Sequence, residues 1–371
     1  MSNFNKFASE SVCAGHPDKV CDQISDAILD TVLQQDPNGR VAVEALAADN
    51  HLVLAGEVTT TAQVDFEAVA RNQIKRLGYT NPYWGFTHES PVVSYIHQQS
   101  PEIAVGVDKD GAGDQGLMFG FACRETSDLM PLPITLAHKL ARCIDQTRES
   151  KKLSYLRPDG KSQVVVDYED GKPVGISNVT LAVPHDESVE LGQVKEDLYR
   201  KVVIPTLADF DLDVKSSDLI VNGTGSWHIP GPSSDCGLTG RKIIVDGYGG
   251  YARVGGGAFS GKDPSKVDRS GAYAARFLAK NIVAAGLADK AEIGLAYYIG
   301  AKRPIWFNIE TFDTATVSQK ALYDFAEKLL VPSVKDIIET LQLKRPLYLQ
   351  TAAYGHFGRS DLPWEEIKKS V

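Results

Sequence analysis

Residues 40–59 read RVAVEALAADNHLVLAGEVT, two runs in which apolar and polar side chains alternate around an Asp-Asn turn. Alternation with a period of two is typical of a β-strand that buries one face. The stretch therefore predicts a hairpin with strands at residues 40–47 and 51–59. A helical pattern follows at residues 64–77 and ends at Gly78. The unit is thus a β-hairpin followed by a helix.

Two later parts of the chain repeat this order. They place strands at 163–168 and 174–183 before a helix near 188–203, and strands at 291–299 and 304–310 before a helix near 317–330. Hairpins of this kind bury one face of a sheet against helices. We therefore predict an α+β fold of three pseudo-repeated domains, each a mixed or antiparallel sheet covered by helices on one face.

Segments rich in Gly, Pro, Ser and Asp mark the joints between domains, at residues 98–116 and 223–237. A chain of 371 residues is also long for a single core. We expect an N-terminal domain at residues 4–101, a central domain at 110–228 and a C-terminal domain at 230–365, whose segments can interleave in space.

Composition narrows the class of protein. The net charge of −9 argues against general nucleic-acid binding. No apolar run approaches the roughly 18 residues that span a bilayer, and the N-terminal stretch lacks the pattern of a signal peptide. The five cysteines are scattered without a Cys-x-x-Cys pair, which favours free thiols in a reducing compartment. We expect a cytoplasmic protein that binds neither nucleic acid nor membrane.

Residues 255–270 read GGGAFSGKDPSKVDRS and carry the strongest functional signal. Glycines let a backbone approach a ligand closely, while lysines and aspartates suit a polyphosphate and its Mg²⁺. Residues 241–269 hold six Lys or Arg and three Asp, a local net charge of +3 in an acidic chain. The stretch predicts a phosphate-contacting loop, with a mobile surface loop as the alternative.

Two familiar nucleotide-binding motifs do not fit. Residues 256–263 (GGAFSGKD) end in Asp where a P-loop needs Ser or Thr, and no parallel βαβ unit surrounds them. Residues 111–116 (GAGDQG) precede a predicted strand at 117–123, whereas a dinucleotide fingerprint precedes a helix. We predict instead a turn that presents Asp114 and Gln115.

Residues 17–36 form an amphipathic helical pattern with Pro17 at the first position. His16 and Asp18 then lie at the helix N-terminus, where peptide N–H groups favour anions. A histidine in such a place is as often structural as functional. Other motifs also have a simpler interpretation that involves no function. Residues 157–162 could form only a turn, and Arg241 and Lys242 could be a solvated pair of cations. Glu44 and Glu57 could be exposed positions on paired strands.

Five motifs occur in a fixed order: GHPDK at 15–19, GAGDQG at 111–116, DCGLTGRK at 235–242, the stretch at 255–270, and TAAYGHFG at 351–358. Together they closely resemble S-adenosylmethionine synthetase (methionine adenosyltransferase), over nearly the whole chain. The resemblance implies three pseudo-repeated α+β domains. It also implies active sites between the two subunits of a homodimer, with dimers that commonly pair into a homotetramer.

The resemblance implies a reaction in which the sulfur of L-methionine attacks C5′ of ATP, followed by hydrolysis of the bound triphosphate to pyrophosphate and phosphate. A thioether sulfur has free lone pairs, so the first step needs no general base. Its barrier lies in expelling triphosphate, and prearranged cations stabilise the charge that develops there. The implied cofactors are Mg²⁺, two per site, and K⁺.

Residue roles are implied by the matched motifs. The implied catalytic residues are His16, Lys161, Arg241, Lys262 and Lys266. The implied ATP contacts are His16, Asp159, Gly160, Lys161, Ser226, Trp227, Asp235, Arg241, Lys242, Ala258 and Lys262. The implied methionine contacts are Glu57, Gln99, Asp235 and Lys266. The implied metal ligands are Asp18 and Asp268 for Mg²⁺ and Glu44 for K⁺, and Asp114 is implied to support the site.

The chain departs from the family pattern at two places. Ser226-Trp227 stand where the family usually has Arg-Phe, which removes one cation from the ATP site. The segment between Gln99 and Asp114, which forms the family's mobile cover, is several residues shorter than in many members. Two other hypotheses stay open at this point: a different ATP-dependent phosphotransferase, and an inactive nucleotide-binding regulator.

Overall fold

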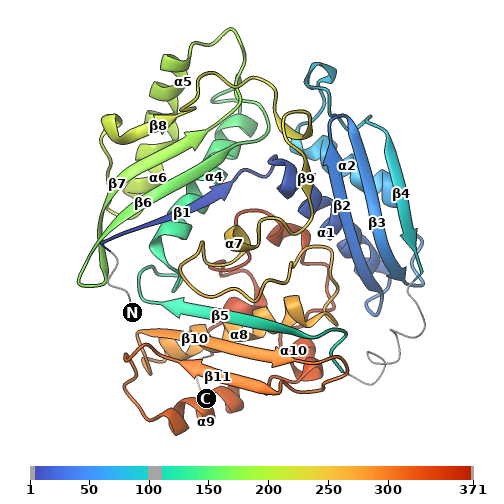
Figure 1. Cartoon of the computed structure of the whole chain (residues 1–371), viewed down its shortest axis with the longest axis vertical. Helices are drawn as coiled ribbons and strands as arrows, with labels where there is room; N and C mark the ends of the chain where they lie inside the picture. The colour runs from blue at the N-terminus through green and yellow to red at the C-terminus, as the bar shows by residue number, and fades with distance from the viewer. Residues whose placement is uncertain (1–4, 99–110, 369–371) are drawn as a thin grey trace.

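The computed structural model describes residues 5–98 and 111–368. Three sheets surround a common centre, and each packs against one long helix, α1 (Pro17–Gln35), α4 (Leu132–Glu149) or α8 (Val267–Ala284) (Figure 1). The predicted α+β architecture of three repeated units is confirmed. The apolar core has two parts, because α1 and α8 share one cluster of buried side chains while α4 packs in another.

All three predicted hairpins are present and antiparallel. They are β2 (Arg40–Ala48) with β3 (His51–Thr59), β6 (Lys161–Glu169) with β7 (Lys172–Ala182), and β10 (Lys290–Tyr297) with β11 (Trp306–Glu310). The helices that follow them are α2 (Phe66–Leu77), α5 (Leu191–Leu198) and α9 (Gln319–Leu329). The repeated order of hairpin and helix is therefore confirmed in each unit.

Helix limits differ from the predicted ones for local chemical reasons. α2 begins after Asp65 because that carboxylate caps the helix and accepts the N–H of Ala68 at 3.0 Å. The helix predicted near 188–203 continues instead through a π-helical turn (Tyr199–Val203) into α6 (Ile204–Ala208). Pro205 lacks an N–H donor, so the regular hydrogen-bond pattern cannot pass through it unchanged.

Strands from distant parts of the chain complete each sheet. The short β9 (Gly237–Leu238) pairs with β2, β5 (Gly116–Cys123) with β10, and β1 (Lys6–Val12) with β6, all antiparallel. β4 (Val92–His97) and β8 (Leu219–Val221) add parallel strands beside β3 and β7. The strand orders are β1-β6-β7-β8, β4-β3-β2-β9 and β11-β10-β5. Two sheets are thus mixed and one is antiparallel, and segments interleave in space.

The remaining elements are short. They are α7 (Ile243–Asp246), α10 (Val334–Thr340), and the 3₁₀ turns Pro82–Trp84, Ser216–Asp218, Gly231–Ser233, Leu349–Thr351 and Pro363–Glu365. Within residues 5–98 and 111–368, no helix combines the length and apolar character needed to cross a membrane.

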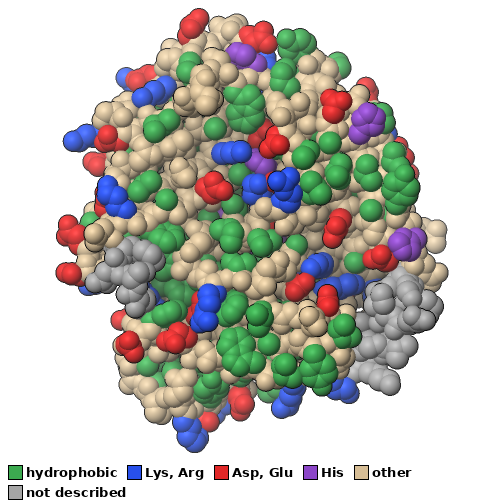
Figure 2. Space-filling model, in the orientation of Figure 1, with side chains coloured by type: hydrophobic (Ala, Val, Ile, Leu, Met, Phe, Trp, Pro, Cys, Tyr) green, Lys and Arg blue, Asp and Glu red, His purple; other side chains and the backbone are tan. Residues whose placement is uncertain are grey.

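The face of each sheet that points away from its long helix is partly open. Large apolar side chains are exposed there on several strands: Leu46, Tyr95, Leu117, Ile220 and Trp306. Figure 2 shows hydrophobic side chains spread over this face, with some Lys, Arg, Asp and Glu side chains near its centre and many others around its rim. Exposed apolar surface around a charged centre is typical of a protein–protein contact that encloses a polar site.

Candidate active site

One long loop, residues 239–261, which we call the excursion, brings many of the predicted site residues to β2. Leu238 pairs with Leu46 of β2, and Lys262 forms a bridge with Ala42 on the same edge. Residues 239–261 leave the strand between these two points and carry the Arg-Lys pair, α7 and the glycine-rich stretch. Four residues of strand separate the points by about 13 Å. The excursion therefore presents two cationic clusters, one where it leaves β2 and one where it returns.

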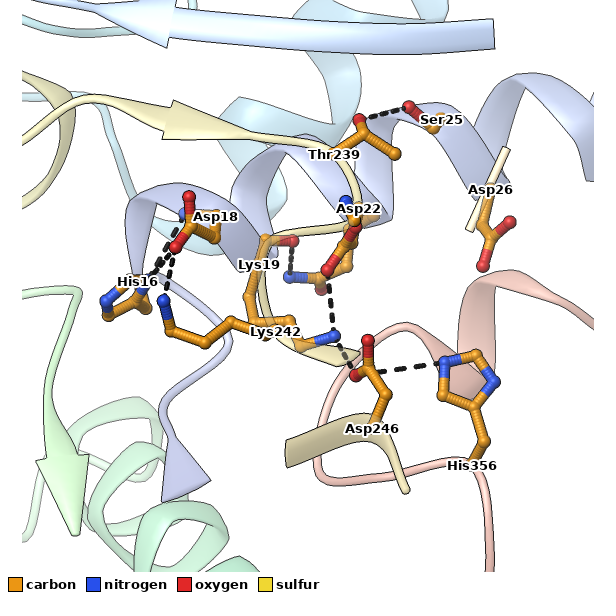
Figure 3. Close-up of polar contacts among 12 residues, drawn as sticks. His16, Asp18, Lys19, Asp22, Ser25, Asp26, Thr239, Lys242, Asp246 and His356 are labelled. Atoms are coloured by element: carbon orange, nitrogen blue, oxygen red, sulfur yellow. Dashed lines mark hydrogen bonds and ion pairs between the residues drawn. The ribbon is translucent and has the colours of Figure 1, made fainter. Parts of the chain in front are cut away.

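The first cluster lies at the N-terminus of α1 (Figure 3). Asp18 accepts hydrogen bonds from Nζ of Lys242 and from the N–H of Leu238, the latter at 3.0 Å. Nη1 of Arg241 lies 3.9 Å from the same carboxylate. His16 is the N-cap residue of the helix, as predicted, and its Nδ1 accepts the N–H of Asp18 at 3.2 Å.

The electrostatic surroundings of this cluster set its protonation. Burial, then the cations of Lys242 and Lys161, lowers the pKa of His16 to about 3. The imidazole is therefore neutral near pH 7, and because Nδ1 accepts an N–H, its proton lies on Nε2. Burial alone would raise the pKa of Asp18, but the bonds from Lys242 and Leu238 hold it below its usual value. A neutral donor thus stands beside an ionised carboxylate.

The carboxylate of Asp159 fastens the turn before β6 to the 3₁₀ turn at Gly231, and its backbone packs against the loop before α1. It adopts a φ of 95°, and its buried carboxylate accepts the N–H groups of Gly160 at 2.6 Å and Gly231 at 3.0 Å. A Cβ on Gly15 would lie only 2.6 Å from the backbone nitrogen of Asp159. The predicted ATP residues at positions 159–161 are therefore held next to the first cluster by direct backbone packing.

Asp159 should give the stability of the protein a pH dependence. Burial raises its pKa to about 7, although amide bonds and Lys161 oppose this. The folded chain then binds this proton more tightly than the unfolded chain, where an Asp pKa is about 4. Stability is therefore expected to fall as pH rises from about 4 to about 7. The urea midpoint of Asp159→Asn should fall less than that of wild type between about pH 5 and pH 8, and equal falls would contradict the assignment.

The second cluster lies where the excursion returns to β2 and α8 begins. Nζ of Lys262 donates to Oδ2 of Asp268 at 2.5 Å. Lys266 is the N-cap residue of α8 and forms an ion pair with Asp263, whose carboxylate also accepts the N–H of Val41 at 2.8 Å. Between the two clusters no hydrogen bond or ion pair is formed by the residues that the structure describes.

The glycines of the 255–270 stretch serve close packing. A Cβ on Gly255 would collide with the carbonyl oxygen of Leu117 in β5, and one on Gly257 would collide with the side chain of Asp268. The stretch therefore lies directly on the start of β5 and on the first turn of α8. Ala258 packs against Gly240, so that the excursion closes on itself beside the Arg-Lys pair.

Glu44 and Glu57 lie on the open face of their sheet. Glu57 pairs with Ala42 across the hairpin and Glu44 pairs with Ala55, so both carboxylates project from the same face. Oε1 of Glu57 is 3.6 Å from Nε2 of His97 on the neighbouring β4, while Glu44 is exposed. Both predicted ligand contacts are thus accessible from the face that carries the apolar surface.

Four other predicted site residues are less closely tied to the clusters. Ser226 and Asp235 are exposed, and Nε1 of Trp227 donates to the carbonyl of Ile229 at 2.7 Å. Asp114 is exposed in the predicted turn and accepts the N–H of the next residue at 2.7 Å. Gln99 lies outside the described residues.

The carboxylates of the two clusters suit a metal ion that arrives with a polyphosphate. In residues 5–98 and 111–368, no group of three or more His, Cys, Asp or Glu side chains converges on one point. Asp18 and Asp268 are instead single carboxylates, each paired with a lysine. Mg²⁺ is commonly held by one or two carboxylates, with phosphate oxygens and water as further ligands. The donor set therefore fits Mg²⁺ rather than a metal held by protein alone.

A stripe of aspartates along α1 was not among the site residues predicted from the sequence. Asp18, Asp22, Asp26 and Asp30 recur every four residues, which places them on one face of the helix. Their carboxylates accept backbone N–H groups from, in turn, Leu238, Gly240, Gly261, and the pair Tyr348 and Leu349. The first three hold the excursion at both of its ends. The spacing of four is the signal that predicts the stripe, although not its partners.

The fold defines a class, a three-domain α+β protein, and the two cationic clusters are its candidate site. Family models for the N-terminal, central and C-terminal domains of S-adenosylmethionine synthetase match residues 5–101, 109–227 and 229–366. Together they cover nearly the whole chain, and the chain belongs to the S-adenosylmethionine synthetase family. The resemblance seen in the sequence is confirmed.

Curated relatives match over almost their full length. An S-adenosylmethionine synthase of Clostridium tetani (strain Massachusetts / E88) is 48% identical, covering 98% of this chain and 97% of the relative. An S-adenosylmethionine synthase of Sulfurovum sp. (strain NBC37-1) is 49% identical, covering 100% of this chain and 97% of the relative. The family likeness therefore extends across all three domains.

Proposed function

We propose that the protein makes S-adenosylmethionine from ATP and L-methionine. The observation that carries the proposal is the pair of lysine–carboxylate clusters, Lys242 with Asp18 and Lys262 with Asp268, at the two ends of one excursion. A lone pair of the methionine sulfur forms the S–C5′ bond while the C5′–O bond breaks, and triphosphate leaves with that electron pair. Water then hydrolyses the bound triphosphate to pyrophosphate and phosphate.

Prearranged cations stabilise the departing triphosphate without reorganisation as its charge develops. The proposed cations are Lys161, Arg241, Lys242, Lys262 and Lys266. Lys242 and Lys262 each contact a carboxylate. Phosphate oxygens of ATP would compete with these carboxylates for the ammonium groups, and the carboxylates would then be available to hold metal ions.

His16 acts by donating a hydrogen bond. Its low pKa keeps the ring neutral, so it does not serve as a general acid near pH 7. The Nε2–H is the free donor of the ring, because Nδ1 already accepts the N–H of Asp18. We assign it to the oxygen that leaves C5′, where negative charge grows as the bond breaks.

The remaining roles are assigned by family likeness. Asp18 and Asp268 would hold Mg²⁺, two ions per site, and bound Mg²⁺ would neutralise part of the triphosphate charge. Glu44 offers one exposed carboxylate for K⁺. The other proposed ATP contacts are Asp159, Gly160, Ser226, Trp227, Asp235 and Ala258. The proposed methionine contacts are Glu57, Gln99, Asp235 and Lys266, with Asp114 in support.

Two features favour a homodimer with its sites at the interface. The clusters of one chain stand about 13 Å apart along β2 without a direct link, and the open sheet faces around them carry exposed apolar side chains. Packing two such faces together would bury this surface and enclose the charged centre. Light scattering should give a mass at least twice the 40.3 kDa of the chain. We assign the protein to the cytoplasm, with no nucleic-acid or membrane partner.

Product analysis tests the proposed function directly. Incubation with ATP, L-methionine, Mg²⁺ and K⁺ should yield S-adenosylmethionine, pyrophosphate and phosphate, all dependent on methionine. A phosphotransferase would instead release ADP together with a phosphorylated product. An inactive regulator would bind ATP without turnover. Either of these outcomes would overturn the proposal.

Asp18→Asn is expected to weaken the binding of the Mg²⁺ on which activity depends. The substitution removes the negative charge that would hold the ion, while the amide oxygen still accepts the N–H of Leu238. The Mg²⁺ concentration for half-maximal rate should rise about tenfold or more, which corresponds to a loss of roughly 1.4 kcal/mol in binding free energy. A titration curve identical to that of wild type would remove Asp18 from the metal site.

A further inference from the structure

A fully buried lysine joins two carboxylates behind the first cluster. Nζ of Lys19 donates to Oδ2 of Asp22 at 2.9 Å and also to Oδ1 of Asp246 (Figure 3). All three side chains are at most 2% exposed. Burial would lower the pKa of Lys19, but the two carboxylates outweigh it and raise this pKa, so the ammonium stays charged.

The two carboxylates flank the Arg241–Lys242 pair on both sides. Oδ1 of Asp22 accepts the N–H of Gly240, the residue before the pair, at 2.8 Å. Asp246 ends α7, and its own N–H donates to the carbonyl of Lys242 at 2.8 Å. Lys19 therefore links α1, through Asp22, to Gly240 directly before the two cations, and it also binds Asp246, four residues after Lys242.

The segment that carries the Arg241–Lys242 pair has little regular secondary structure of its own. α7 spans only four residues, and its N-cap residue Lys242 makes no capping bond with its side chain. A buried ion cluster is weak as a source of stability, because well-packed apolar side chains often replace such a cluster without loss. What an apolar replacement cannot supply is a directed hydrogen bond to the N–H of Gly240 and a charge link to Asp246.

We propose that Asp22, together with Lys19 and Asp246, is a positioning unit that sets the backbone of Arg241 and Lys242 so that these cations meet the triphosphate of ATP. Its three side chains are buried, and we assign it an action through the excursion that it holds. This inference rests on the proposed function.

A double-mutant cycle in the full-length protein tests the proposal. Asp22→Asn keeps the side-chain volume but removes the charge opposite Lys19. We expect it to lower kcat/KM for ATP about 10- to 100-fold, the loss typical of a catalytic group misplaced by about 1 Å. In a Lys242→Ala background the same substitution should lower kcat/KM by a clearly smaller factor than in wild type, because one of the two cations that it positions is already absent.

Asp30→Asn is the matched control. Asp30 lies on the same face of α1 and also accepts backbone N–H groups, from Tyr348 and Leu349, but it contacts none of the proposed cations. Any loss that it causes should be the same with or without Lys242, as expected of independent sites. A purely structural role for Asp22 would produce this additive pattern too.

The outcomes separate clearly. Additive losses for Asp22→Asn and Lys242→Ala would overturn the proposal. If Asp22→Asn does not fold, Asp246→Asn runs the same cycle, and failure of both to fold would also overturn it, since the unit would then serve folding. Affinity for inorganic tripolyphosphate gives a second readout, with the same coupling expected. A wild-type protein that forms no S-adenosylmethionine would refute the proposed function, while the tripolyphosphate cycle would still test the positioning unit.

Discussion

Replacing Lys262 by alanine is expected to lower kcat for S-adenosylmethionine formation about 10²- to 10³-fold, the loss typical of one transition-state donor. Lys262 is held at the edge of β2 by its backbone bridge to Ala42, and its side chain is 25% exposed. The ammonium is thus fixed in place yet open to a ligand. Because the charge on the leaving triphosphate is greater in the transition state than in bound ATP, the loss should fall on kcat more than on KM for methionine.

The fold should survive this change, since among the described residues the lysine side chain has one hydrogen-bond partner, the partly exposed carboxylate of Asp268. Lys328→Ala on the exposed surface of α9 is the matched control, and its rates should equal those of wild type. Turnover is measured with saturating ATP and methionine, and thermal unfolding is recorded for both variants. A near-wild-type rate for Lys262→Ala would remove Lys262 from the proposed machinery.

Glu365→Ala is expected to lower the free energy of unfolding by about 3–5 kcal/mol, the range for breaking a buried ion pair. The buried carboxylate accepts hydrogen bonds from Nε and Nη2 of Arg276 at 2.9 and 2.8 Å. It also accepts hydrogen bonds from Nζ of Lys280 at 2.7 Å and from the N–H of Gly358 at 2.8 Å. Without it, two buried cations on α8 lose their counter-charge. Urea unfolding followed by circular dichroism measures the loss.

The next residue provides the control for this experiment. Glu366 is exposed and pairs with Lys368 at the surface, where such pairs contribute about 1 kcal/mol or less. Glu366→Ala should therefore leave the urea midpoint almost unchanged. A similar midpoint for the two variants would show that the buried cluster contributes no special stability.

The same carboxylate predicts a pH dependence of that difference. Burial would raise the pKa of Glu365, but Arg276 and Lys280 outweigh it and lower this pKa below its usual value. Its contribution is then fully present above the unfolded pKa of about 4.3 and is lost as pH falls through the lower folded value. The gap in stability between wild type and Glu365→Ala should narrow in acid.

Local structure could be predicted well because short-range patterns determine it. The hairpin of β2 and β3 follows from alternation, and α2 ends at Gly78, whose φ of 97° suits a residue without a Cβ. His16 and Pro17 start α1 as expected. Two helix limits moved where a cap or a proline acted, at Asp65 and Pro205.

The partners of each element could not be predicted, because they depend on contacts between distant residues. Nothing local indicates that β5 joins β10 or that β1 joins β6. Asp263 illustrates the point within the site. In the sequence it stands where a P-loop would need Ser or Thr. In the structure it accepts the N–H of Val41 and pairs with Lys266, so that it ties the returning excursion to β2.

By itself, the sequence determined the three hairpin–helix units, the family and the residue types of the site, because periodicity and motif order are properties of neighbouring positions. Only the tertiary structure decided that Lys19 and Asp246, 227 positions apart, meet in the core behind the Arg-Lys pair. A buried charge is stable only where opposite charge is packed against it. Such a partner is fixed by how helices and loops pack in three dimensions, and no spacing along the chain reveals it.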